Sequence, residues 1–521
     1  MTDRRPNILF IMADDHAAKA IGAYGHGLNE TPSIDRLATE GMRLDHCYVT
    51  NSICTPSRAA ILTGTYNHVN GVTTLETGFD NRAPHLAKHL RQAGYRTAMI
   101  GKWHLGEGPA HRPSGFDHWD VLPGQGDYFD PLMIDANGAR RASGYVTDVI
   151  TDRCLEWLEE DVQEGESDRP FFLMCHHKAP HRNFAPHPRH RHLFDDEDVA
   201  LPDTFDDDYK TRAQAAHCAR MRVRSDFEYE DLGLAQPEGG DEVGPIHVEG
   251  RPGRKVPDPE DPGDLRLIDV NTGETFTFAT RVELDRFKYQ RYIKRYLATV
   301  AAIDENVGRL LDWLDRRGLA DDTLVVYTSD QGFFLGEHGW FDKRFMYEES
   351  LQMPFLARYP RRIAPGTVSA DLVCNVDFAP TFLDLASVRV PSYMQGRSFR
   401  AVLEGATPAD WRQQVYHRYW MHRDESHHAF AHYGIRDRSH KLIHWYNDDL
   451  GQPGAHPPLD EQPEWELFDC ERDPLELLNV FDDPAYGDVR ARMIAALDEM
   501  MLEIGDIPEH DSRTLGAGRE R

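Results

Sequence analysis

Four short apolar runs recur along the chain, and polar residues follow each of them. The runs cover residues 7–12, 97–100, 171–175 and 323–328. Such runs are typical of strands that are buried on both faces of a parallel sheet. Helical patterns lie between or near them, at 84–93, 145–160, 283–317 and 375–386. We therefore predict an α/β fold, with a large mixed, mostly parallel sheet flanked by helices.

The polar residues that follow these runs should lie close together. They are Asp14 and Asp15, Lys102 and His104, His181, and Asp330 and Gln331. In a doubly wound sheet the carboxyl ends of the strands open on one edge, where ligands bind. Adjacent carboxylates repel one another unless a cation pairs them, and carboxylate and carboxamide oxygens suit a hard divalent cation. Taken alone, Asp14-Asp15 also fits a solvated turn, and Lys-x-His is a weak signal.

The segment 54–58 predicts the start of a short helix that ends near Gly64. Thr55 can cap this helix, the following proline suits its first turn, and a glycine suits its end. Cys54 would then lie at a helix N-terminus, where free N–H groups favour an oxyanion. Arg58, one turn further, adds a fixed cation. From spacing alone, a helix start with a chance cysteine is an equal alternative.

The motif around Cys54 resembles the signature of the type I sulfatases, a formylglycine-dependent family of the alkaline phosphatase superfamily. It reads C-x-P-S-R-x-x-x-L-T-G over residues 54–64. The G-K-W-H-L-G segment at 101–106, the Pro-His pair ending at His181, and Lys343 are also similar to that family. The resemblance runs from residue 7 to about 479. It implies an alkaline phosphatase-like fold with a small C-terminal antiparallel sheet-plus-helix subdomain.

The resemblance also implies a cofactor and a partner. In this family the cysteine is oxidised to formylglycine after translation, so a formylglycine-generating enzyme would act on Cys54 during maturation. The divalent cation, Ca²⁺ or alternatively Mg²⁺, would be held by oxygen ligands. The metal ligands implied in this way are Asp14, Asp15, residue 54, Asp330 and Gln331.

The implied reaction is hydrolysis of a sulfate monoester. One hydroxyl of the hydrated aldehyde at position 54 would attack sulfur and release the alcohol. His104 would take the proton of the other hydroxyl, so that sulfate leaves and the aldehyde re-forms. Arg58 and Lys102 would hold the formylglycine and sulfate oxygens. The leaving alcohol would be protonated by His181 and Lys343.

Three alternatives to a sulfatase remain at this point. The first is a phosphonate monoester or phosphodiester hydrolase of the same superfamily, although the Pro-Ser-Arg form of the motif points to sulfate. The second is a metal-dependent phosphomutase or phosphatase, which would use serine or threonine as its nucleophile. The third is a non-catalytic binding protein with unmodified Cys54, against which the complete set of partner residues argues.

Charge and composition limit the classes of substrate, the cysteine chemistry and the location that we expect. The net charge of −29 disfavours nucleic acid, anionic membranes and long polyanions, so we expect a small sulfated carbohydrate. Seven scattered cysteines indicate neither a disulfide framework nor a zinc site. The N-terminus shows no signal-peptide pattern and no apolar run reaches the length of a membrane span, so we expect a cytoplasmic protein.

We expect a catalytic domain at 1–405 and a C-terminal subdomain at 406–521. An acidic, Pro- and Gly-rich insertion at about 195–279 contains a hairpin pattern at 265–278. It could serve as a lid or as a contact in a homo-oligomer, or it could be a tolerated excursion. Substrate contacts beyond the sulfate would come from this insertion and from four residues for which a structural role is the alternative: His338, Trp420, His422 and His428.

Overall fold

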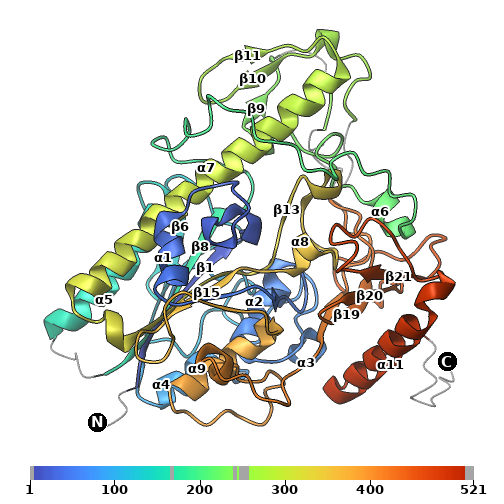
Figure 1. The fold of residues 1–521 in the computed structure, drawn as a ribbon. Coiled ribbons are helices and arrows are strands. Elements are labelled where there is room, and N and C mark those ends of the chain that lie inside the picture. Colours follow the sequence, from blue (N-terminus) through green and yellow to red (C-terminus); the bar gives the residue numbers. More distant parts are fainter. Residues whose placement is uncertain (1–4, 165–168, 239–242, 246–256, 511–521) are drawn as a thin grey trace.

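The computed structural model describes residues 5–164, 169–238, 243–245 and 257–510. Its centre is a ten-stranded mixed sheet with helices on both faces (Figure 1). In spatial order the strands are β16 (Thr367–Ser369), β2 (Met42–Leu44), β15 (Phe355–Arg358), β12 (Thr323–Ser329), β1 (Asn7–Asp14), β8 (Phe171–Pro180), β4 (Arg96–Lys102), β5 (His118–Leu122), β6 (Leu132–Asp135) and β7 (Gly138–Arg141). The predicted fold class is confirmed.

The four strands predicted from the apolar runs are neighbours in the middle of this sheet. β12, β1, β8, β4 and then β5 run parallel, whereas β15 and β6 pair antiparallel beside them. Because successive residues of β1 point to opposite faces, Ile8 and Phe10 join one hydrophobic core while Leu9 and Ile11 join another. The carboxyl ends of these parallel strands therefore meet at one edge.

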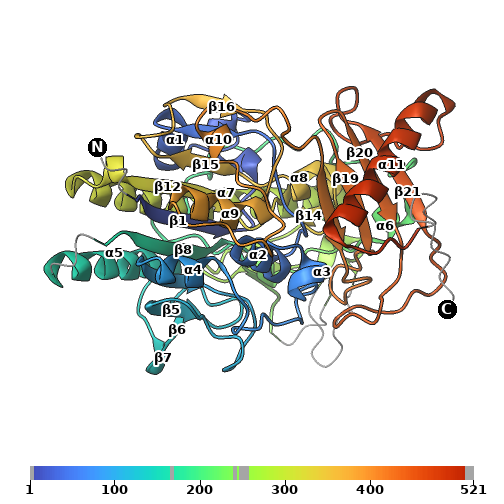
Figure 2. The same ribbon diagram turned by 90° about the horizontal axis from the view of Figure 1, so that it is seen from below.

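Helices cover both faces of the sheet (Figure 2). One face carries α1 (Pro32–Thr39), α5 (Val146–Glu164) and α7 (Arg281–Arg316), whose apolar residues share a core with the sheet. The other face carries α2 (Cys54–Thr63), α4 (Leu86–Gln92), α9 (Phe378–Leu385) and α10 (Arg400–Leu403). Shorter elements are α3 (Asn67–Asn70), α6 (Gln214–Cys218), α8 (Glu348–Leu351), the pair β3 (Cys47–Tyr48) with β17 (Val373–Cys374), and the pair β13 (Phe334–Leu335) with β14 (Phe341–Asp342).

The C-terminal part of the chain forms a separate four-stranded antiparallel sheet. Its strands are β18 (Val415–Tyr419), β19 (His432–Arg436), β20 (His440–Trp445) and β21 (Glu464–Asp469), and α11 (Gly487–Ile504) packs against them. His417 of β18 contacts Ser52 at 3.1 Å, two residues before Cys54. This sheet therefore braces the segment that leads into α2, and the exact boundary at 405/406 stays a prediction.

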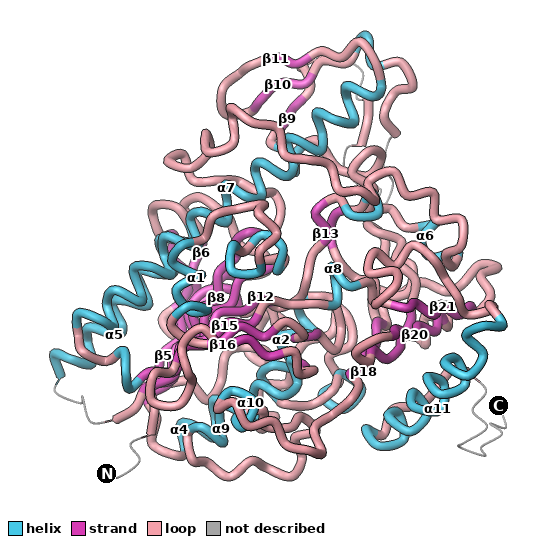
Figure 3. The backbone as a smooth tube through the Cα atoms, in the orientation of Figure 1, coloured by secondary structure: helices cyan, strands magenta, loops and turns pink. Residues whose placement is uncertain are grey.

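The insertion packs over the first half of α7. Its three short strands are β9 (Leu234–Ala235), β10 (Leu267–Asp269) and β11 (Thr275–Phe276), which Figure 3 shows beside that helix. β10 and β11 pair antiparallel, so the predicted hairpin is confirmed. Parts of the predicted insertion, 239–242 and 246–256, lie outside the described residues. Among the residues that are described, no helix combines the length and apolar character that a bilayer crossing requires.

Candidate active site

Cys54 is the first residue of α2, at the carboxyl edge of the sheet. The helix ends at Gly64, which adopts the left-handed conformation with φ of 68°, as predicted. The expected cap is wrong in detail, because Ile53 is the N-cap and Thr55 lies inside the first turn. The Thr55 hydroxyl instead lies 3.4 Å from Nδ1 of His104. No side chain caps α2, so its first N–H groups stay available at the site.

β1 and β12 bring the acidic residues together. Asp14 ends β1, and Asp15 follows it in a left-handed conformation with φ of 69°. The Asp15 backbone N–H donates to Oδ1 of Asp330 at 3.2 Å, and the Asp330 N–H donates to the carbonyl of Ala13 at 3.2 Å. These bonds lock the two strand ends against each other, so the three carboxylates face one point.

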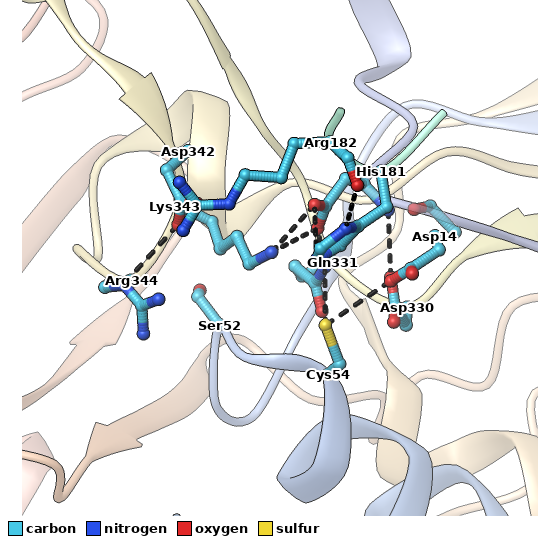
Figure 4. A network of polar contacts seen from close by, with 12 residues as sticks. Asp14, Ser52, Cys54, His181, Arg182, Asp330, Gln331, Asp342, Lys343 and Arg344 are labelled. Atoms are coloured by element: carbon cyan, nitrogen blue, oxygen red, sulfur yellow. Dashed lines mark hydrogen bonds and ion pairs between the residues drawn. The ribbon is translucent and has the colours of Figure 1, made fainter. Parts of the chain in front are cut away.

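The Cys54 thiol lies beside Asp14, at the edge of this cluster (Figure 4). Its Sγ is 3.3 Å from Oδ1 of Asp14 and 3.9 Å from Nε2 of Gln331. Burial and the Asp14 carboxylate raise the pKa of the Cys54 thiol well above its usual value. The unmodified side chain is therefore protonated at neutral pH and is a poor nucleophile.

Two buried cations tie α2 and β4 to the carboxylates. Arg58 donates to Oδ2 of Asp330 through Nε at 3.0 Å and through a terminal nitrogen at 2.9 Å. Its other terminal nitrogen donates to the Lys102 carbonyl at 2.8 Å. The Lys102 ammonium donates to Asp14 and to the side-chain carbonyl of Gln125.

A third buried cation reaches the site from the loop after β14. The Lys343 ammonium lies 2.7 Å from both carboxylate oxygens of Asp15. The Gln331 carboxamide also donates to Asp15, while its Oε1 is buried without a hydrogen-bond partner. A buried acceptor without a partner, beside carboxylates, is a position that a cation can satisfy.

The two histidines flank this cluster on different sides. The Nδ1–H of His181 donates to the Arg182 carbonyl at 2.8 Å, which leaves Nε2 facing Asp15 at 3.7 Å. Burial, with Lys102 as the largest charge, lowers the pKa values of both His181 and His104 well below their usual range. His104 lines a cavity of about 300 Å³. His181 lines a different cavity of about 730 Å³, which also contains Cys54.

Two of the three carboxylates ionise less readily than usual in this buried position. Burial, only partly offset by Lys343, raises the pKa of Asp15 to about 7, and burial with the Asp14 charge raises that of Asp330 to about 6. Burial also disfavours ionisation of Asp14, but the charges of Lys102, His181 and Arg58 hold its pKa well below the usual value. One oxygen from each carboxylate lies within 4.8 Å of the others. These oxygens and that of Gln331 form a donor set that fits a hard divalent cation.

A cavity of about 730 Å³ opens onto Cys54, His181 and Lys343. Its walls come from the ends of β8 and β14, the insertion at Glu228 and Asp231, and loops of the C-terminal sheet near 421–427 and 454–456. Its volume is of the size that holds a small ligand.

The structure does not bring four of the predicted substrate contacts to this cavity. They are His338, Trp420, His422 and His428. His338 lies 2.9 Å from Asp207 among buried aromatic rings, and Arg423 donates to His428 at 3.0 Å. Trp420 and His422 are buried elsewhere in the C-terminal region. Neighbouring residues such as His427 do line the cavity, so the geometry favours them over these four residues as groups that a ligand could reach.

Sequence reasoning missed a polar network on the cavity wall. His427 lies 3.3 Å from Asp342 and 2.9 Å from Asp424, and Arg182 approaches its Nε2 at 2.8 Å. Arg344 adds a cation 3.4 Å from Asp342. Asp342 and Arg344 flank Lys343 in the sequence, and Arg182 follows His181. Their positions next to predicted site residues could have identified them as residues of the cavity wall.

The comparisons with known proteins agree with this geometry. A family model described as sulfatase matches residues 6–388, and one described as the C-terminal part of N-sulphoglucosamine sulphohydrolase matches residues 336–503. The chain belongs to the sulfatase family, with an alkaline phosphatase-like fold, and is a hydrolase that acts on sulfate esters.

Individual relatives cover nearly the whole chain. An N-acetylglucosamine-6-O-sulfatase of Bacteroides thetaiotaomicron is 43% identical, over 98% of this chain and 89% of that protein. A solved structure described as a complex with its substrate D-glucosamine-2-N,6-O-disulfate is 40% identical, with a TM-score of 0.84 over 98% of this chain and 100% of the other. A phosphonate monoester hydrolase of Agrobacterium radiobacter shares the fold, with a TM-score of 0.66, 20% identity, and coverage of 96% of this chain and 95% of that one.

Proposed function

We propose that this sulfatase removes the 6-O-sulfate from a small N-substituted glucosamine. The chemistry named for the two relatives that are at least 40% identical supports this choice of sugar. The observation that carries the proposal is the position of Cys54 at the uncapped start of α2, against Asp14 and at the inner end of a cavity of about 730 Å³.

The proposal includes a divalent cation and formylglycine at position 54. Asp14, Asp15, Asp330 and Gln331 would hold the cation, Ca²⁺ or Mg²⁺, because the three carboxylates converge and the Gln331 Oε1 is buried without a partner. The raised pKa values of Asp15 and Asp330 show that their buried ion pairs do not fully offset the cost of ionising them. The cation would stabilise negative charge on the sulfate. Hydrated formylglycine would supply one hydroxyl as the nucleophile. Deprotonation of its second hydroxyl would allow sulfate to leave.

The chain's own residues would orient the ester and move protons. Arg58, fixed by Asp330, presents its charge next to residue 54. His104, kept neutral by burial, can accept a proton on the α2 side. For His181 to protonate the leaving alcohol, Nε2 must carry a second proton, because Nδ1–H is engaged with a carbonyl. Burial opposes this imidazolium form, and the charge of Asp14 favours it. Lys343 stays charged and would stabilise the leaving oxygen.

The sugar ring would lie against the polar network of Asp342, Arg344 and His427. These groups present donors and acceptors to the cavity, as hydroxyl recognition requires. At the cavity mouth, the exposed charged residues among those described are Glu76 and Glu425. Two carboxylates there would repel a second sulfated unit, which favours small substrates over polymers.

A panel of substrates tests this function. The holoenzyme should show a higher kcat/KM for N-acetylglucosamine 6-sulfate than for 3-O- or 4-O-sulfated sugars, aryl sulfates or sulfated polymers. A preference for phosphonate monoesters over every sulfate would contradict the proposal, and a preference for polymer over monosaccharide would contradict its size argument.

A further inference from the structure

Five lysines are buried in the part of the chain that the structure describes, and one of them differs from the rest. They are Lys102, Lys178, Lys288, Lys343 and Lys441. Four of them form an ion pair with a carboxylate: Lys102 with Asp14, Lys288 with Asp258, Lys343 with Asp15 and Lys441 with Glu348. Among the described residues, no carboxylate pairs with Lys178.

The ammonium of Lys178 has spare hydrogen-bonding capacity. This side chain is on β8, and the residue is 4% exposed. Its Nζ donates to the Arg182 carbonyl at 3.3 Å and lies 4.8 Å from the centre of the Tyr128 ring. An ammonium carries three donors, so the described residues leave at least one of them unused. Burial, followed by repulsion from Lys102, lowers the pKa of Lys178 to about 8.

Burying a charge without a counter-ion lowers the stability of the fold, so a counter-ion is expected in the functional state. Lys178 lines the main cavity together with Cys54 and His181. The missing counter-ion can therefore come from a ligand in that cavity. A sulfated sugar supplies anionic oxygens there, either from the sulfate being hydrolysed or from a second anionic group such as an N-sulfate.

We infer that Lys178 binds an anionic oxygen of the sulfated sugar, as a substrate-binding residue in addition to the cluster around Cys54. The inference rests on the proposed function for its choice of ligand. Loss of a charge-assisted hydrogen bond to an anion should weaken affinity by about 10- to 100-fold.

The test compares neutral and charged variants of the holoenzyme. Lys178→Met and Lys178→Gln should lose about tenfold or more in kcat/KM, whereas Lys178→Arg should retain most of it. N-acetylglucosamine 6-sulfate and glucosamine 2-N,6-O-disulfate are the two substrates. A loss confined to the disulfate assigns Lys178 to the second anionic group, and an equal loss on both assigns it to the reacting sulfate.

Stability and sulfate binding provide readouts that do not depend on turnover. Lys178→Met should unfold at the same or a higher temperature, because an unpaired buried charge is removed. The matched control Lys288→Met should unfold at a lower temperature, because Asp258 then keeps only Tyr229 and the partly exposed Arg281 as partners. It should keep its kcat/KM within about twofold, because Lys288 does not line the cavity. Inorganic sulfate, titrated calorimetrically, should bind the neutral Lys178 variants more weakly if Lys178 holds the reacting sulfate.

The inference is overturned if both neutral variants keep kcat/KM on both sugars, and their affinity for inorganic sulfate, within about twofold of the unmodified protein. If the unmodified holoenzyme hydrolyses neither sugar, the proposed substrate fails. In that case, weaker sulfate binding by the neutral variants still supports Lys178 as an anion-binding residue, and unchanged sulfate binding overturns the inference.

Discussion

Replacing Arg58 with methionine should destabilise the fold by about 3–5 kcal/mol, the usual cost of removing one partner of a buried ion pair. Arg58 is almost fully buried, and three of its nitrogens donate hydrogen bonds, two of them to Asp330. Without it, the carboxylates of Asp330 and Asp14 face each other with less compensation. A neutral side chain of similar length cannot replace these bonds.

The expected change in unfolding temperature scales with the length of the chain. An unfolding entropy of about 2 cal/mol/K per residue gives roughly 1 kcal/mol/K for this protein, so the melting temperature should fall by about 3–5 °C. Differential scanning calorimetry with a chelator present measures it. Added Ca²⁺ should reduce the deficit, because a bound cation would also neutralise Asp330 and Asp14.

Two controls separate this effect from a general loss of an arginine. Arg58→Lys keeps the charge but loses the forked geometry, so its deficit should be intermediate. Arg309→Met removes a partly exposed pair with Asp152, which should cost at most about 1 kcal/mol. If Arg58→Met melted within about 1 °C of the unmodified protein in chelator, the reasoning about the buried cluster would be refuted.

Two further predictions concern the cation and the cavity wall. The gain in melting temperature on adding Ca²⁺ should grow as pH rises from about 5 to 8. The raised pKa values of Asp15, about 7, and Asp330, about 6, mean that protons leave these carboxylates over this range and cease to compete with the cation; a gain that shrinks with pH would contradict the site. His428→Ala should leave KM within about twofold, because His428 does not line the cavity, and a tenfold rise in KM would restore it as a substrate contact.

The sequence predicted the sheet and the clustering of its polar residues for a physical reason. Fully buried strands such as β1 and β12 carry uninterrupted apolar runs, and parallel strands bring the residues after their carboxyl ends to one edge. The hydrophobic pattern of α7 also predicted this helix correctly, and the observed helix begins only slightly earlier than predicted.

The substrate wall could not be predicted in the same way. His427 reaches the cavity from a loop of the C-terminal sheet, and its partner Asp342 comes from β14. Contacts between distant loops do not produce a periodic pattern in the sequence. From the sequence we therefore selected His428, which is one residue away from His427. Lys178 was missed because a lysine at the end of a strand looks the same whether or not a carboxylate pairs with it. The prediction that Thr55 caps α2 was wrong. The Thr55 hydroxyl contacts His104 instead of a backbone N–H of the helix.

The central claim, catalysis through an oxidised Cys54, is tested by measuring two quantities on the same preparations. Peptide mass spectrometry gives the fraction of position 54 present as aldehyde, and sulfate release gives turnover per chain. Preparations from hosts with high and low conversion should show turnover proportional to the aldehyde fraction, with none at zero aldehyde. A preparation containing only the thiol, or a Cys54→Ser variant, that turned over sulfate esters at the full rate would contradict the account.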